Sequence, residues 1–338
     1  MSEAMSSRTC GVFLQGIDPP GTFSDFARDV EDWGYDILWV TDSSLRARYP
    51  YVYLTLAAQA TRRVRLGVGV THPHTRHPAL NLHAMLAIDE LSGGRAIFGV
   101  GMGDRPVVEL GHKPAKVETV RQMVETSRAL LRGEHVTRDG SPFAFRDAWL
   151  RFGVRKDMPI YIAAGGPRML EMAGEVADGV IVVCGVVPGA MRVAMDLIGK
   201  GAARAGRRVE DIDVAFLGFC SVGNDRRVAL DECRSMAAWV PATFPFYADA
   251  AGIPPEVTGR IKAAYAGGDI HDAGGAEKLT PDEVVQAFAF AGTPDDVARQ
   301  VETIRDAGFT HIELFLTGHD RRRTVELFAR HALPVFRG

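Results

Sequence analysis

Short apolar segments alternate with helical patterns along nearly the whole chain. Each segment is apolar throughout, which is typical of a parallel strand buried on both faces. Eight such strands are predicted, over Gly11–Leu14, Ile37–Val40, Val64–Val70, Ala96–Val100, Ile160–Ala163, Gly179–Val183, Ile212–Phe219 and His311–Leu316. The simplest closure is an α/β fold, a (β/α)8 TIM barrel with its active site at the carboxyl ends of the strands.

Helical patterns lie between these strands, and two stretches interrupt the alternation. The helices are predicted over Phe23–Gly34, Tyr51–Ala60, Pro78–Leu91, Lys116–Leu131, Met169–Val176, Pro188–Ala205, Val297–Ala307 and Thr324–Val335. Turn residues from Asp139 to Pro142 indicate a hairpin insertion near 133–152. A second insertion, helical or irregular, is predicted near 224–290. We expect one domain that spans residues 1–338.

Composition excludes several classes of protein. The formal net charge is −3 and no basic cluster is interleaved with aromatic residues, so nucleic-acid binding is not expected. No apolar run has transmembrane length and the first residues lack the apolar core of a secretory signal, so we expect no membrane partner. The four cysteines have no CxxC spacing. The chain is therefore predicted to be a reduced, cytoplasmic protein.

Three predicted strands end in glycine-rich turns. The third strand runs into Gly69-Val70-Thr71-His72-Pro73, the fourth into Gly101-Met102-Gly103-Asp104, and the fifth into Gly165-Gly166-Pro167. Glycine at a strand end permits a close backbone approach, and bare N–H groups at a helix start favour anions. This face of the barrel is predicted to bind a phosphate-bearing cofactor with a flat ring. The alternative for the last turn is a plain strand–helix connection.

These motifs, taken in order, resemble the luciferase-like monooxygenase superfamily. Further matches are Trp33-Gly34-Tyr35-Asp36, Ser92-Gly93-Gly94-Arg95 and Ala177-Asp178-Gly179. The chain looks most like the branch that uses the deazaflavin coenzyme F420, which includes methylenetetrahydromethanopterin reductases and glucose-6-phosphate dehydrogenases. The resemblance implies hydride transfer between C5 of coenzyme F420 and a small organic substrate, and a homodimer.

The resemblance also implies a set of cofactor-binding residues. The cofactor phosphate is expected on Gly165 and Gly166, with Gly185 lining the same groove. A cis peptide bond is expected between Gly69 and Val70, behind the deazaflavin ring. The complete expected set is Asp42, Gly69, Val70, Thr71, His72, Met102, Gly103, Ala164, Gly165, Gly166 and Gly185.

Two aspartates are expected to be catalytic. Hydride transfer leaves a substrate that needs a proton or a hydroxyl that must lose one, and a carboxyl group of raised pKa suits that step. In the resembled branch an acidic residue in the motif of Asp104 faces the reactive centre, and the counterpart of Asp42 contacts the ring. From sequence alone, Asp104 also fits a turn or N-cap carboxylate, and Asp42 a loop hydrogen bond.

The histidines and arginines of the loops leave alternatives open. His72 fits either a cofactor contact or a satisfied structural histidine, and His74 and His77 fit structural roles. None has cysteine or carboxylate neighbours at ligand spacing, so we expect no metal. The run Arg321-Arg322-Arg323 fits a solvated loop or helix start, with contact to an anionic cofactor tail as the alternative.

Two departures from the resembled enzymes limit what can be carried over. The reductases have a glutamate in the first strand where Phe13 stands here, and the dehydrogenases have a histidine where Ser43 follows Asp42. Neither complete catalytic set is present, so the substrate is not fixed. The alternatives are an FMN-dependent monooxygenase of the same fold and a non-catalytic member that only binds the deazaflavin.

Overall fold

The barrel closes as predicted. The computed structural model describes residues 8–265 and 273–338. Within these ranges eight parallel strands pair around a ring, and β11 returns to pair with β1. In ring order they are β1 (Thr9–Leu14), β2 (Ile37–Val40), β3 (Arg65–Val68), β4 (Ala96–Val100), β7 (Ile160–Ala164), β8 (Gly179–Val182), β9 (Asp213–Val222) and β11 (His311–Leu316).

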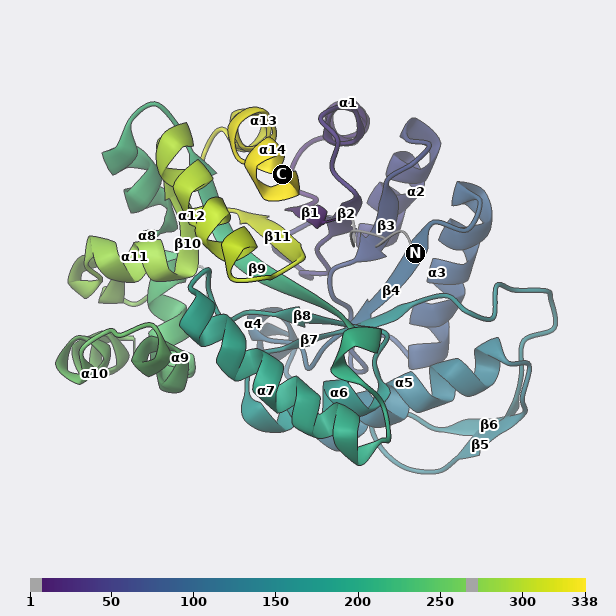
Figure 1. Cartoon of the computed structure of the whole chain (residues 1–338). Helices are drawn as coiled ribbons and strands as arrows, with labels where there is room; N and C mark the ends of the chain where they lie inside the picture. Colours follow the sequence, from purple (N-terminus) through teal and green to yellow (C-terminus); the bar gives the residue numbers. More distant parts are fainter. Residues whose placement is uncertain (1–7, 266–272) are drawn as a thin grey trace, which may run out of the picture.

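Helices surround the strands, as Figure 1 shows. Apart from a last short helix, the helices outside the two insertions are α1 (Pro20–Asp32), α2 (Pro50–Ala60), α3 (Pro78–Ser92), α4 (Arg105–Glu109), α5 (Val117–Leu131), α6 (Pro167–Val176), α7 (Pro188–Arg204), α12 (Pro294–Asp306) and α13 (Arg321–His331). The short α4 was not predicted. The final helix predicted over Thr324–Val335 is in fact two, because α13 ends and α14 (Leu333–Arg337) begins around Ala332. Pro334 has no N–H to continue the helical hydrogen bonds.

The strands bury both of their faces. In β2, Leu38 and Val40 pack in the layer between the barrel and its helices, while Ile37 and Trp39 point into the barrel interior. A side chain on Gly67 of the neighbouring strand would collide with the Trp39 ring. Glycine at this position therefore makes room for a large ring inside the barrel.

Both predicted insertions are present in the described residues. The hairpin pairs β5 (Val136–Arg138) with β6 (Phe145–Ala148) in antiparallel orientation. The second insertion contains α8 (Arg226–Thr243), α9 (Pro245–Ala250), α10 (Pro255–Ala264), α11 (Asp282–Phe288) and β10 (Ala289–Gly292). Residues 266–272 of the expected 224–290 insertion lie outside the described residues. A single domain over 1–338 stays a prediction.

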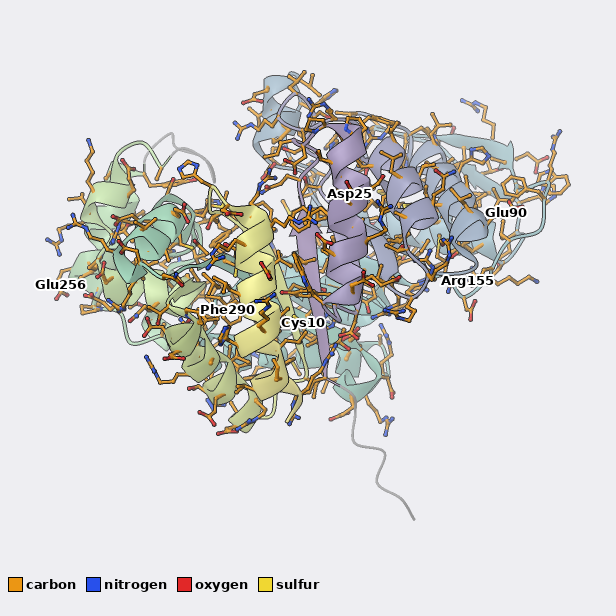
Figure 2. All side chains as sticks on the ribbon, turned by 90° about the horizontal axis from the view of Figure 1, so that it is seen from above. Cys10, Asp25, Glu90, Arg155, Glu256 and Phe290 are labelled. Atoms are coloured by element: carbon orange, nitrogen blue, oxygen red, sulfur yellow. The ribbon has the colours of Figure 1, made fainter. Side chains whose placement is uncertain are left out.

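The second insertion is attached to the barrel through its last strand. The unpredicted β10 pairs with the end of β9, so that Phe290 lies opposite Cys220. Figure 2 shows Phe290 and Cys10 among the packed elements, with Glu256 of α10 at the far edge of the insertion. All four cysteines are buried and unbridged. Among the described helices, none is both long and apolar enough to span a membrane.

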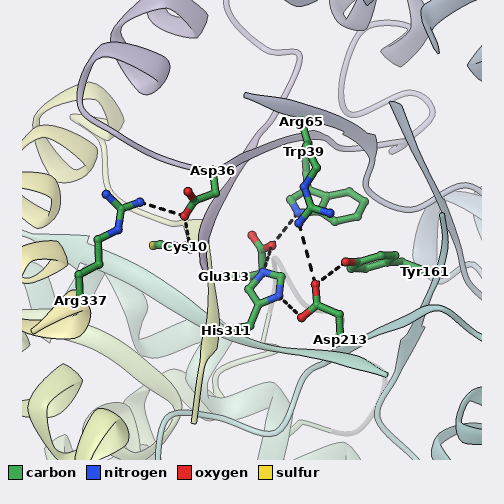
Figure 3. Close-up of polar contacts among 9 residues, drawn as sticks. All are labelled: Cys10, Asp36, Trp39, Arg65, Tyr161, Asp213, His311, Glu313 and Arg337. Carbon is green, nitrogen blue, oxygen red and sulfur yellow. Dashed lines mark hydrogen bonds and ion pairs between the residues drawn. The ribbon is translucent and has the colours of Figure 1, made fainter. Parts of the chain in front are cut away.

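A buried polar network lies near the amino ends of the strands (Figure 3). The two ring nitrogens of His311 lie 2.7 Å from Asp213 Oδ1 and 2.9 Å from Glu313 Oε1. Trp39 Nε1 donates to the same Glu313 oxygen at 2.9 Å. Burial acts to lower the pKa of His311, but hydrogen bonds and charge from the two carboxylates raise it to about 9. The network therefore holds a histidine cation inside the barrel.

Candidate active site

A cleft of about 1490 Å³ opens at the carboxyl ends of the barrel strands. Segments that follow β1, β2, β3, β4, β7 and β11 line it, together with Ile181 of β8, Phe219 of β9 and Trp239 of α8. Barrel geometry brings these strand ends to one face, which is where active sites of this fold lie. The long insertion supplies one wall of the cleft.

Most of the site residues predicted from the sequence line the cleft. Those that line it are Asp42, Gly69, Val70, His72, Met102, Gly103, Asp104, Ala164, Gly165 and Gly166. Two predicted residues do not line it. Thr71 is wholly buried behind the wall. Gly185 packs against Ala287 and Phe288, away from the lining. The cis peptide bond expected between Gly69 and Val70 is present.

Asp42 is buried at the cleft wall, and only one of its two carboxylate oxygens has a partner among the described residues. Its Oδ2 pairs with Arg76, while Oδ1 is buried with no hydrogen-bond partner among the described residues. Burial raises the pKa of Asp42 despite the charge and hydrogen bond of Arg76. A buried oxygen of this kind is costly unless it accepts a hydrogen bond. Asp42 is therefore a residue of the cleft wall with one oxygen whose hydrogen-bonding capacity is unmet among the described residues.

Arg76 is held from behind by residues outside the cleft. It donates from Nε to Asn81 Oδ1 at 2.7 Å and from Nη2 to Thr71 Oγ1 at 3.2 Å. Its guanidinium also lies 5.2 Å from the ring centre of Tyr49. Thr71 thus acts on the site through Arg76. In the sequence, Arg76 is marked only by its place in a loop between His74 and His77, so its role was missed.

His72 lies at the cleft wall in a neutral state. Its side chain is almost fully buried, and burial followed by the charge of Arg76 lowers the pKa of His72 to about 4. The backbone N–H of His74 donates to Nδ1 at 3.4 Å, which places the remaining proton on Nε2. His72 thus has both a structural hydrogen bond and a place in the cleft, and the two sequence alternatives are compatible. Among the described residues no cluster could hold a metal ion.

The start of α6 faces the cleft and has the backbone and charge features of an anion-binding site. Gly165, Gly166 and Arg168 all line it. The first N–H groups of a helix have no helical carbonyl to bond and carry partial positive charge. The guanidinium of Arg168 adds a full charge to the same end of the cleft.

An aromatic group from the insertion covers this turn. A side chain on Gly165 would collide with the ring of Phe244, whereas one on Gly166 would come no closer than 3.6 Å to that ring. Trp239 packs edge-on against Phe244, with ring centres 5.4 Å apart. The sequence showed aromatic residues in the insertion but could not place them, because the contact spans about eighty residues of chain.

Asp104 ends the β4 turn at the exposed side of the cleft. It lines the cleft beside Gly103, and its side chain makes no capping hydrogen bond to α4 in the described residues. Asp104 is exposed, whereas Asp42 is buried. Asp42 is therefore the shielded carboxyl of the cleft, and Asp104 is the carboxyl in contact with water.

The departures noted in the sequence also lie in the cleft. Phe13 and Ser43 both line it. Phe13 stacks on Trp39 with ring centres 5.5 Å apart, so that the floor of the cleft is a hydrocarbon surface. The arginine run begins α13, where Arg321 pairs with Asp18 at 2.7 Å and also lines the cleft. The helix-start interpretation thus holds, and one member of the run reaches the site.

The fold and this cleft define a class of barrel enzymes, and comparison with known proteins identifies the family. Residues 5–311 match the luciferase-like monooxygenase family, and the chain belongs to it. A 5,10-methylenetetrahydromethanopterin reductase of Methanolobus tindarius is 34% identical over 307 residues, which are 90% of this chain and 93% of that protein.

Two further relatives agree with this placement. An F420-dependent glucose-6-phosphate dehydrogenase of Amycolatopsis mediterranei is 27% identical, with 94% of this chain and 95% of that protein covered. The solved structure of the coenzyme F420 dependent tetrahydromethanopterin reductase from Methanopyrus kandleri superposes with a TM-score of 0.84 at 29% identity. That superposition covers 98% of this chain and 99% of the solved chain.

Proposed function

We propose that this protein is an oxidoreductase that transfers a hydride between C5 of coenzyme F420 and a small organic substrate. The observation that carries the proposal is the single cleft that joins the start of α6 to the unpartnered Oδ1 of Asp42. One end suits a phosphate, and the other offers an acceptor to a polar ring. Two of the named relatives are F420-dependent, which favours this cofactor over FMN.

The residues of the cleft fit this cofactor. Gly165, Gly166 and Arg168 would hold the phosphate, and Asp42 would accept a hydrogen bond from the ring system. Val70, Met102 and the remaining lining glycines would form the walls around the ring. When bound, coenzyme F420 supplies or accepts a hydride at C5.

A side chain of the protein transfers the proton that accompanies the hydride. Asp104 lies in contact with both the cleft and water, so it can exchange a proton with solvent and pass it to or from the substrate. The hydrocarbon floor around Phe13 excludes water from the deep part of the cleft. Phe13 and Ser43 replace groups on which the resembled enzymes rely, so we propose no substrate from those relatives.

Substitution of Gly166 tests the proposed phosphate site. Gly166→Asp places a negative charge at the start of α6, and we expect it to weaken F420 binding at least tenfold through charge repulsion. Gly166→Ala is the control. The backbone at Gly166, with φ −85° and ψ 154°, accepts any residue, and the added carbon meets Phe244 at an ordinary contact distance. Its affinity, followed by titration of cofactor fluorescence, is expected to change less than threefold.

An F420 affinity in Gly166→Asp as high as that of the wild type would place the phosphate elsewhere. Equal losses in both would show that space at Gly166, rather than charge, limits binding.

We also propose a homodimer in the cytoplasm. The outward faces of α2 and α3 expose Val52, Leu80 and Leu91, each 47% or more accessible. Large apolar side chains exposed on two neighbouring helices favour a contact with another protein. Four buried, unbridged cysteines support a reducing compartment. Sedimentation equilibrium tests the dimer, and a mass of one chain would exclude it.

A further inference from the structure

Tyr247 connects the long insertion to the turn before α6. It lies in α9 with its side chain wholly buried. Its hydroxyl donates to the carbonyl oxygen of Gly165 at 3.0 Å, across 82 residues of sequence. Burial raises the pKa of Tyr247 far above its usual value, so the hydroxyl keeps its proton and acts as the donor.

This hydrogen bond fixes the orientation of one peptide group. In a trans peptide the C=O of Gly165 and the N–H of Gly166 point in opposite directions. Because the carbonyl is held toward Tyr247, the Gly166 N–H points away from the insertion. Gly165 and Gly166 both line the cleft, so that N–H is available to a ligand at the start of α6.

Aromatic packing holds Tyr247 in this position. Its ring centre lies 4.2 Å from that of Phe246 and 6.1 Å from that of Phe244. Phe244 in turn covers Gly165. The turn is therefore fixed from its outer side by residues of the insertion.

We propose that Tyr247 is a positioning residue for anion binding, which holds the Gly165–Gly166 peptide with its N–H directed at the cofactor phosphate. The inference rests on the proposed function. Tyr247 acts through the peptide and does not touch the cofactor. It gives the insertion a direct part in binding the cofactor tail, besides forming a wall of the cleft.

The test compares two ligands in one variant. Tyr247→Phe keeps the ring and removes the hydroxyl. We expect the Kd for F420 to rise about five- to tenfold, as for loss of one hydrogen bond that orients a charged contact. The Kd for the phosphate-free deazaflavin riboside should change less than twofold, because that ligand does not use the Gly166 N–H. Titration of ligand fluorescence measures both.

Tyr35→Phe is the matched control. Tyr35 is also buried, and its hydroxyl donates to the carbonyl of Val325 at 2.9 Å, outside the cleft. It should change neither Kd. A thermal melt of each variant, read beside the titrations, reports how much of the protein is folded.

The outcomes separate this inference from the proposed function. Equal losses for both ligands in Tyr247→Phe, or no loss for F420, would overturn the positioning role. Wild-type protein that binds F420 no more tightly than the phosphate-free ligand would also overturn it while leaving the cofactor assignment intact. Wild-type protein that binds neither deazaflavin would instead contradict the proposed function.

Discussion

Asp104→Asn is expected to lower turnover by roughly 10²-fold while the affinity for F420 stays within a few-fold. The amide cannot exchange the proton that must accompany hydride transfer. It has nearly the same shape, so the cleft wall is preserved. Steady-state rates with reduced and oxidised cofactor, together with a fluorescence titration, measure the two quantities separately.

Asp139→Asn is the matched control, because it shows what the same replacement does outside the cleft. Asp139→Asn makes the same change on the hairpin, where the side chain is 80% exposed and outside the cleft. It should leave turnover unchanged. If Asp104→Asn behaved like this control, Asp104 would be a turn residue at the start of α4 and Asp42 would become the candidate acid.

The second large effect concerns stability. His311→Leu is expected to lower the free energy of unfolding by about 3–5 kcal/mol at pH 7, because it leaves the wholly buried carboxylate of Glu313 without its cation. Glu313 already has one oxygen without a partner among the described residues. Urea denaturation measures the loss. His331→Leu, on the exposed surface of α13, is the control and should change stability little.

The pH dependence of stability follows from the direction of the His311 shift. Its pKa is about 9 in the folded protein, against 6.5 ordinarily. A group whose pKa rises on folding contributes its full stabilisation below the unfolded value and loses it as the pH rises through the folded value. Stability from His311 should therefore fall between about pH 6.5 and 9.

A double-variant cycle isolates that histidine. Burial raises the pKa of Glu313, which adds its own fall in stability with pH, so the comparison is made with Glu313→Gln. In that background the fall above pH 6.5 should persist with His311, over a narrower range because Glu313 no longer raises the pKa of His311, and should disappear with His311→Leu. The double variant should also recover part of the loss seen in His311→Leu. A fall that survives in the double variant would mean that another group carries it.

The barrel and the cleft were predictable because local patterns specify them. Continuous apolar strands such as Ile37–Val40 reveal burial on both faces. Glycine-rich strand ends such as 165–167 reveal where the backbone must approach another group closely. The closed ring then brings these ends together without further information from the sequence.

The parts that were missed depend on contacts between distant segments. Arg76 is defined by Asp42, Thr71 and Asn81, and nothing near Arg76 in the sequence shows that pairing. His311 looks like an ordinary first residue of a strand until β9 brings Asp213 beside it. The short β10 could not be predicted, because its residues, Ala289–Gly292, are a strand only through their pairing with the end of β9. Tertiary pairing decides such cases, and strand patterns alone do not contain it.

The relative affinity for F420 and FMN decides which cofactor this protein uses. Purified protein without cofactor is titrated with F420 and, separately, with FMN, and the fluorescence of each ligand gives its Kd. We expect F420 to bind at least tenfold more tightly than FMN, because this chain is similar over nearly its whole length to F420-dependent enzymes. FMN binding as tightly as F420, or more tightly, would contradict the assignment and favour a flavin-dependent monooxygenase.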